Sequence, residues 1–327
     1  MSADFTILGA GVCGLAVAAA LHGRGAGVRL VDPAGTPGAH ACSWWAGGML
    51  APECEGVSAE PEVVGQGRRA ADWWAREGAD VKRKGTLVVA LERDQSELKT
   101  FARRTPTAEW LEKIAVSAKE PHLGDRHSKA LFVNEEAHLD PRTTLQCLFD
   151  RLIIEGVTFS ADEPSAFGQI IDCRGLAAKD HLPDLRGVKG EMLVVRCRDV
   201  KLHRPARLLH PRFPLYIVPR GDGVFMLGAT QIESGDRSRA SLRSVSELIN
   251  AAYALHPAFG EAELLEIGVD ARPAFPDNQP RIRHTQDRVY VNGLFRHGFL
   301  LAPALAEMTA DLLIHGIPPE IWYEDYR

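Results

Sequence analysis

The hexapeptide GAGVCG that begins at Gly9 constrains the possible folds of this chain more than any other segment. It stands between an apolar run typical of a strand, residues 5–8, and an apolar run typical of a helix, residues 15–21. In such a unit Gly9 permits the tight turn, Gly11 lets the backbone approach a pyrophosphate, and Gly14 lets helix and strand pack closely. The free N–H groups at the start of the helix attract the phosphates. We therefore predict a Rossmann-like dinucleotide-binding unit.

An acidic residue ends the next strand-like run, residues 28–31, and narrows the choice of nucleotide. Asp32 is placed to accept hydrogen bonds from ribose hydroxyls, and its charge would repel the extra phosphate of NADP. The glycine motif itself does not choose between FAD and NAD. An NAD-type domain would continue with a further helix and strand, whereas residues 33–38 form a turn-rich linker. A module that binds only NAD is therefore disfavoured.

The bulk properties describe a globular protein and argue against several classes of partner. The chain has 327 residues, 45% of them hydrophobic and 25% charged, which is long enough for two domains. The net charge of −5 provides no basic surface, so we expect neither nucleic acid nor a membrane as a partner. The N-terminal run carries Asp4 where a secretory signal is positively charged, and no stretch elsewhere reaches the about 20 apolar residues of a membrane span.

The six cysteines are scattered, with no CxxC pair and no short spacing between cysteine and histidine. This pattern predicts no metal site and no disulfide framework. It favours a protein of the reducing cytoplasm.

A second glycine-rich segment follows the linker, at residues 41–52. Small residues and a glycine pair stand there beside bulky apolar side chains, which suits a backbone that lies close against a large flat ligand. The alternative is a buried glycine-rich turn with Trp44 and Trp45 in the core.

The remainder of the chain shows a change from helical to strand patterns. We expect an amphipathic helix over residues 61–76, a strand over 85–91, a helix from Pro141 to about residue 155 with Asp140 as its N-cap, and a helix over 244–255. Between residues 190 and 230 the pattern predicts strands at 191–196, 215–219 and 224–227, with a hairpin turn at 220–223. Such a meander indicates an antiparallel sheet and a separate substrate domain.

Several motifs in order along the chain carry a resemblance to a known family. Besides GAGVCG, Asp32 and the run into Gly48-Met49, they are EAHLDP from Glu136, LYIVPR from Leu215, GAT from Gly228, ARP from Ala271 with Asp277-Asn278, and GLFRHGFLLAPALAEM from Gly293. Together they resemble the D-amino-acid-oxidase superfamily of FAD enzymes, and within it the glycine oxidases of thiamine biosynthesis. The similarity spans nearly the whole chain.

The resemblance implies an α/β fold, α+β overall, in which a mainly antiparallel substrate domain is inserted into a Rossmann-like FAD-binding domain. The FAD-binding domain would comprise residues 1–55, 130–187 and 268–327, and the substrate domain residues 56–129 and 188–267. Some relatives attach the flavin through a cysteine in the C-terminal part of the chain. Because no cysteine follows Cys197, we expect non-covalent FAD.

The resemblance also implies site residues. Tyr216, Arg272 and Arg296 match positions that hold the substrate. The cofactor-binding positions are Gly9, Gly11, Val12, Cys13, Gly14, Asp32, Ala41, Cys42, Ser43, Gly47, Gly48, Met49, Gly175, Leu294, Phe295, Arg296, His297, Gly298, Phe299 and Leu300. Between residues 156 and 170 the chain is shorter than in related flavoproteins, so their adenine contacts there cannot be carried over.

The implied substrate is a small α-amino acid, whose carboxylate is its one constant feature. A planar guanidinium pairs bidentately with a carboxylate, so we expect Arg272 to bind it, with Arg296 as a second cation and Tyr216 as a hydroxyl donor. The alternatives are a structural salt bridge for Arg272 and a core position for Tyr216. We expect hydride transfer from the substrate α-carbon to flavin N5, without a general base if the amine arrives neutral.

The resemblance implies that O₂ reoxidises the flavin and releases hydrogen peroxide, and that the imine product hydrolyses to glyoxylate and ammonia or passes to a thiazole synthase. We expect a cytoplasmic homo-oligomer. Three alternatives remain open: an oxidase of sarcosine or a small D-amino acid, a dehydrogenase that passes electrons to another carrier, and a non-catalytic flavin-binding redox sensor.

Overall fold

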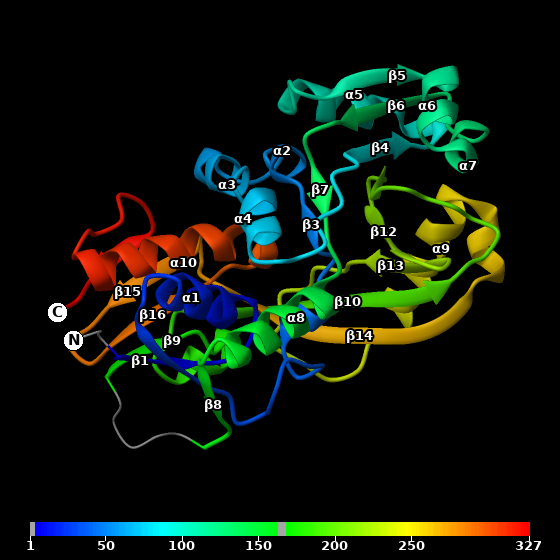
Figure 1. Ribbon diagram of the computed structural model, residues 1–327. Helices are drawn as coiled ribbons and strands as arrows, with labels where there is room; N and C mark the ends of the chain where they lie inside the picture. The colour runs from blue at the N-terminus through cyan, green and yellow to red at the C-terminus, as the bar shows by residue number, and fades with distance from the viewer. Residues whose placement is uncertain (1–3, 163–167) are drawn as a thin grey trace.

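The computed structural model describes residues 4–162 and 168–327, in which two large sheets stand side by side (Figure 1). A seven-stranded sheet lies with α1 (Val12–His22) and α10 (Gly298–His315), and an eight-stranded sheet lies with α9 (Leu242–Leu255). The third sheet consists of two short antiparallel strands, β3 (Met49–Leu50) and β7 (Ala137–His138). This mixed architecture confirms the predicted fold class. The connection that we predicted to be shortened contains residues 163–167, which lie outside the described residues.

The seven-stranded sheet has the order β17-β15-β16-β9-β1-β2-β8 and carries the dinucleotide motif. The strands from β16 to β8 run parallel, and β15 is antiparallel to β16. The central strands carry apolar side chains at most of their buried positions, among them Phe5, Ile7 and Leu30, which belong to one core. The strands are β1 (Asp4–Leu8), β2 (Gly27–Val31), β8 (Thr158–Ser160), β9 (Gln169–Asp172), β15 (Arg281–His284), β16 (Arg288–Asn292) and β17 (Tyr323–Asp325).

Two apolar helices form the core beside this sheet. Helix α1 (Val12–His22) is buried from Val12 to Leu21, and α10 (Gly298–His315) packs against it. In the described part of the chain α10 is the one helix whose length and mean hydropathy of 1.2 would suit a membrane span. Because 61% of that span is buried within the protein, α10 is explained as a core helix. Helix α8 (Pro141–Ile154) also contacts α1, and Asp140 caps it by accepting from the Thr143 N–H, as predicted.

The eight-stranded sheet has the order β14-β10-β13-β12-β11-β4-β6-β5 and is antiparallel except between β11 and β4. The predicted meander is confirmed, although β10 begins five residues earlier than expected. The strands are β4 (Thr86–Ala90), β5 (Glu109–Glu112), β6 (Lys129–Val133), β10 (Arg186–Arg196), β11 (Ala206–Leu209), β12 (Leu215–Gly221), β13 (Val224–Gly228) and β14 (Glu263–Ala274).

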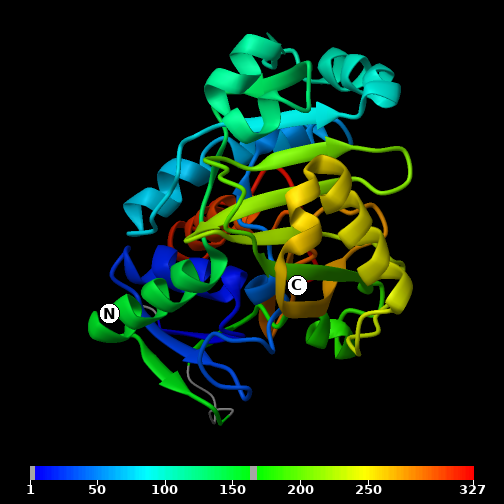
Figure 2. The ribbon, with the colours of Figure 1, turned by 90° about the vertical axis from the view of Figure 1, so that its right-hand side faces the viewer.

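Alternation along these strands separates an apolar core from the face that carries polar side chains. Helix α9 (Leu242–Leu255), yellow in Figure 2, lies against the sheet. Leu208, Leu215 and Ile217 belong to the core that this helix shares with the sheet. Because side chains alternate along a strand, Arg207 and Tyr216 point to the opposite face.

The expected single helix over residues 61–76 is wrong: the chain forms α3 (Pro61–Gly67) and α4 (Ala70–Arg76) with a break between them. Gly67 packs against α10 so closely that a Cβ there would lie 2.8 Å from the side chain of Leu300. This contact and the low helix propensity of glycine explain the break. Helix α4 is tied to α10 because the Trp74 indole donates to the Phe299 carbonyl at 2.7 Å.

Three elements differ from the predicted domain boundaries, which remain a prediction. Helices α3 and α4 pack into the core beside α1 and α10, although residues 56–129 had been assigned to the substrate domain. Strand β6 belongs to the eight-stranded sheet, although the FAD-binding domain had been expected to resume at residue 130. The remaining helices are α2 (Pro52–Glu55), α5 (Gln95–Arg104), α6 (Lys113–Lys119), α7 (Pro121–Gly124) and the 3₁₀ segments η1 (Cys42–Trp45), η2 (Glu92–Asp94), η3 (Gly175–Asp180) and η4 (Pro257–Glu261).

Candidate active site

A cavity of about 970 Å³ gathers residues from both sheets and from the segments between them. It is lined by the dinucleotide loop, the second glycine segment, strands β11, β12 and β14, and the start of α10. Every predicted site residue except Gly14 lies on its wall. The structure therefore brings together positions that are up to 291 residues apart, from Gly9 to Leu300. The roles of these residues remain predictions.

The glycines of the dinucleotide loop adopt the geometry that their motif requires. Gly9 has a φ of 97°, in the region that favours glycine, and a Cβ there would lie 2.8 Å from the Cys173 carbonyl oxygen. A Cβ on Gly14 would lie 1.8 Å from the Gly9 carbonyl oxygen, so only glycine allows α1 to approach the turn. Gly14 thus acts behind the loop instead of on the cavity wall.

The Asp32 side chain holds the dinucleotide loop by accepting hydrogen bonds from backbone N–H groups. One carboxylate oxygen accepts from the Ala10 N–H at 2.9 Å, and the other accepts from the Ala34 N–H at 3.0 Å. Ser43, from the second glycine segment, accepts from the Val12 N–H at 3.3 Å. These bonds join three separate stretches of chain into one wall of the cavity.

This wall fits a dinucleotide. Helix α1 has Gly11 as its N-cap, so it lacks a side-chain cap, and it has no acidic residue in its first turn. Its positive end therefore faces the cavity, where an anionic group is stabilised. The glycine turn leaves the space that a side chain would fill, as a bound pyrophosphate requires.

Arg272, on β14, presents to the same cavity a guanidinium without an acidic partner. It donates to the Thr230 carbonyl at 3.2 Å, and among residues 4–162 and 168–327 no carboxylate lies within 4.0 Å of it. Gly190, on the neighbouring strand, makes room for it, since a Cβ there would lie 2.3 Å from Nη2 of Arg272. A half-buried, unpaired cation in a cavity is suited to bind an anion.

Tyr216 lines the same cavity as this cation. Its ring packs against Gly47 and Gly228. A Cβ added at Gly47 would lie 2.9 Å from the ring, and a Cβ added at Gly228 would lie 2.7 Å from it, so neither position has room for a side chain. Burial raises the pKa of Tyr216, so its hydroxyl stays protonated and can donate a hydrogen bond. In the described part of the chain no hydrogen bond engages this hydroxyl, which leaves it available to a ligand.

Arg296 is placed differently from Arg272, because it has an acidic partner. Its Nε lies 2.9 Å from Oε2 of Glu55, and its Nη2 donates to the Ser58 hydroxyl. His297 is buried behind it, with Nε2 at 3.1 Å from the same carboxylate oxygen. Arg296 thus lies on the cavity wall in an ion pair, and its contact with substrate remains a prediction.

Two residues of this wall, Glu55 and Arg207, were missed by the sequence reasoning. Nη2 of Arg207 lies 2.6 Å from Oε1 of Glu55. Although burial opposes both charges, the pair raises the pKa of Arg207, and Arg207, His297 and Arg296 hold the pKa of Glu55 well below its usual range. Glu55 stands three residues after the second glycine segment, and this nearness in the chain was the available signal. No motif in the sequence pointed to Arg207, because only the strand register places it opposite Tyr216.

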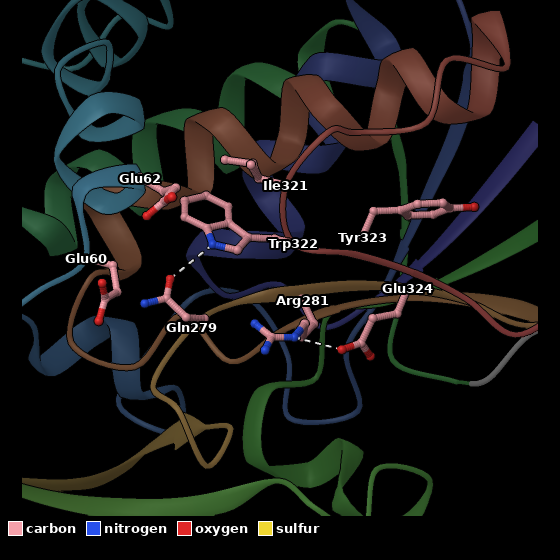
Figure 3. A pocket seen from close by; sticks show the side chains of 8 residues that line it. All are labelled: Glu60, Glu62, Gln279, Arg281, Ile321, Trp322, Tyr323 and Glu324. Carbon is pink, nitrogen blue, oxygen red and sulfur yellow. Dashed lines mark hydrogen bonds and ion pairs between the residues drawn. The ribbon is translucent and has the colours of Figure 1, made fainter.

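A second cavity, of about 370 Å³, lies between α3 and the C-terminal segment (Figure 3). None of the predicted site residues lines it. Its polar groups bond to one another: the Trp322 indole donates to Gln279 at 3.0 Å, and Arg281 donates to Glu324 at 2.8 Å. These bonds fasten the C-terminal segment, so the larger cavity is the candidate active site.

Comparison with known proteins places the chain among flavoenzymes. Residues 4–312 match the family model DAO, described as FAD dependent oxidoreductase. The chain is 52% identical to a ThiO protein of Rhizobium etli, whose name assigns it provisionally as a thiamine biosynthesis oxidoreductase, over 95% of this chain and 97% of that protein. It is 26% identical to the glycine oxidase of Bacillus licheniformis, over 99% of this chain and 96% of that protein.

Two further similarities concern domain fusion and fold. The chain is 26% identical to the bifunctional protein ThiO/ThiG of Nostoc sp., over 96% of this chain and 53% of that longer protein. The crystal structure of glycine oxidase from Bacillus cereus superposes with a TM-score of 0.80 at 23% identity, over 97% of this chain and 96% of that chain. The last comparison shows a common fold.

Proposed function

This chain belongs to the DAO family of FAD-dependent oxidoreductases, and we propose that it oxidises glycine or another small amino acid. The observation that carries the proposal is the unpaired guanidinium of Arg272, which lines the same cavity as Tyr216 and the dinucleotide loop. The similarity to the ThiO protein and to a glycine oxidase supports this substrate class and a role in thiamine biosynthesis.

The cofactor would be FAD, bound without a covalent link. The loop around Gly11, the start of α1 and the Asp32 carboxylate would hold its pyrophosphate and ribose. The wall of residues 41–49 and the segment of residues 294–300, which leads into α10, would enclose the rest of the cofactor. When bound, FAD supplies a two-electron acceptor for the hydrogen on the substrate α-carbon.

The protein's own contribution is to hold and orient the substrate. Arg272 would pair with the carboxylate, and the Tyr216 hydroxyl would donate a second hydrogen bond to it. Two contacts of fixed direction restrict how the α-carbon is presented, which is the main catalytic effect that positioning provides. Half-burial strengthens the ion pair because fewer waters compete for either charge.

A hand-off of the product to a thiazole synthase is part of the same proposal. The bifunctional ThiO/ThiG protein of Nostoc sp. supports it, since one polypeptide there combines a region similar to this chain with a second region. A cytoplasmic location and a homo-oligomeric state remain predictions.

The test starts from the purified protein and has two stages. Denaturation should release a yellow chromophore with the spectrum of FAD, and a colourless protein that takes up no FAD would exclude the proposal. Peroxide should then form with glycine, sarcosine or D-alanine. Reduction of an artificial dye without peroxide would indicate a dehydrogenase, and no reaction with any of the three amines would indicate a non-catalytic sensor.

A further inference from the structure

Glu55 accepts contacts from three basic side chains inside the cavity. One oxygen, Oε1, lies 2.6 Å from Nη2 of Arg207. The other, Oε2, lies 2.9 Å from Nε of Arg296 and 3.1 Å from Nε2 of His297. Glu55 is the last residue of the short helix α2. Its carboxylate lies between the guanidinium groups of Arg207 and Arg296.

This cluster lies on the far side of Tyr216 from Arg272. Arg207 pairs directly with Tyr216 in the ladder of β11 and β12, whereas Arg272 lies three strands away in the opposite direction, on β14. All of them line the same cavity, together with Glu55. Arg272 on one side of Tyr216 is therefore unpaired, whereas Arg207 and Arg296 on the other side are neutralised by the Glu55 carboxylate.

We propose that Glu55 determines specificity, because its carboxylate fills a second carboxylate-binding site formed by Arg207 and Arg296. This inference rests on the proposed function and deepens it. With the second site filled from within, the enzyme accepts amino acids that have one carboxylate. An additional carboxylate on the substrate would meet Glu55 and be repelled.

The charges of the cluster support this role. The other nearby acid, Glu136, is buried, and burial raises its pKa, which weakens it as a counter-ion. Among the described residues, loss of the Glu55 charge would leave the guanidinium groups of Arg207 and Arg296 without a carboxylate within 4.0 Å. Their planar forks match a carboxylate in geometry, so an external carboxylate is the natural replacement.

A role of Glu55 as a general base is disfavoured. Both of its oxygens are engaged, and Arg207, His297 and Arg296 hold its pKa well below its usual range despite burial. A base with such a low pKa accepts a proton poorly near neutral pH.

The test compares the binding of acetate with that of malonate, which has one more carboxylate, by titration calorimetry on the FAD-loaded protein. The wild type should bind malonate no more tightly than acetate. In Glu55→Gln the ratio of malonate to acetate affinity should rise about tenfold, as one added charge-assisted contact provides. In Glu55→Gln combined with Arg207→Gln the ratio should return toward the wild-type value.

The matched control is Glu53→Gln. Glu53 lies on the same helix and is paired with Arg68 at 2.7 Å, but it is not among the described residues that line the cavity. Its replacement should leave the affinity ratio unchanged. Turnover gives a second readout: Glu55→Gln should shift the kcat/KM preference from D-alanine toward D-aspartate, which differs from it by one carboxylate.

An unchanged affinity ratio in a folded, FAD-loaded Glu55→Gln protein would overturn the inference. If the variant is unstable, malonate should restore its thermal stability more than acetate does, because malonate replaces the lost carboxylate. Failure of that rescue would also overturn it. The binding measurement needs no turnover, so a wild-type protein that is inert to amino acids would refute the proposed function alone.

Discussion

Replacement of Arg272 is the most direct perturbation of the candidate site. Truncation of one partner of a buried, hydrogen-bonded charge pair costs about 2–5 kcal/mol. Because the Arg272 side chain is half-buried, we expect the lower part of this range, about 2–3 kcal/mol. Since 1.4 kcal/mol is tenfold in affinity, Arg272→Ala should raise KM for glycine about 30- to 150-fold. Arg272→Lys keeps the charge but loses the planar fork, so it should have a smaller effect.

The folded protein should tolerate this change. Within the described residues the Arg272 guanidinium has one hydrogen bond, to the Thr230 carbonyl, and no ion pair. Loss of such a bond costs about 1 kcal/mol. FAD content and thermal stability should therefore stay near those of the wild type, which separates a binding defect from misfolding.

The assay is the release of peroxide as a function of glycine concentration, with kcat and KM determined separately. Arg196→Ala is a suitable control, since Arg196 pairs with Glu263 at 3.1 Å and is not among the described residues that line the cavity. A KM for Arg272→Ala within about threefold of the wild-type value, below 1 kcal/mol, would refute the reasoning. The substrate carboxylate would then be held elsewhere, and Arg272 would be structural.

Three further outcomes are expected. Tyr216→Phe should raise KM roughly tenfold with FAD retained, because one hydrogen bond to a charged group is lost; an unchanged KM would place the hydroxyl outside the substrate site. Gly14→Ala should be purified with little FAD, since its Cβ would collide with the Gly9 carbonyl, whereas Gly65→Ala, with open space around it, should retain FAD. Burial, Arg220 and Lys82 lower the pKa of His138 from 6.5 to about 4. His138 therefore stays neutral in the folded protein at a pH where it is already protonated in the unfolded chain. The stability that neutral His138 contributes above pH 6.5 is lost as the pH falls toward about 4. Urea unfolding should show about 2 kcal/mol of this loss between pH 7 and pH 5, and a His138→Gln variant with an equally large loss would contradict the assignment.

Local elements were predictable from the sequence because short-range sterics and capping determine them. The GAGVCG turn leads from β1 into α1 as expected, since only glycine fits at Gly9 and Gly14. The cap at Asp140 formed as predicted, because its side chain bonds three residues ahead. The helix over residues 61–76 failed as a prediction, because its break depends on a contact between Gly67 and Leu300, which are distant in the chain.

The sequence by itself determined the family, the cofactor class and the glycine-rich part of the cavity wall, because each is carried by contiguous motifs whose spacing can be read along the chain. Only the tertiary structure decided how the charges of that wall are shared. Arg272 and Arg296 look equivalent in the sequence, yet one is unpaired and the other is bound by Glu55. That difference arises because the fold brings Glu55 to Arg207, which is 152 residues away, and the strength of an ion pair depends on separation and burial instead of sequence order.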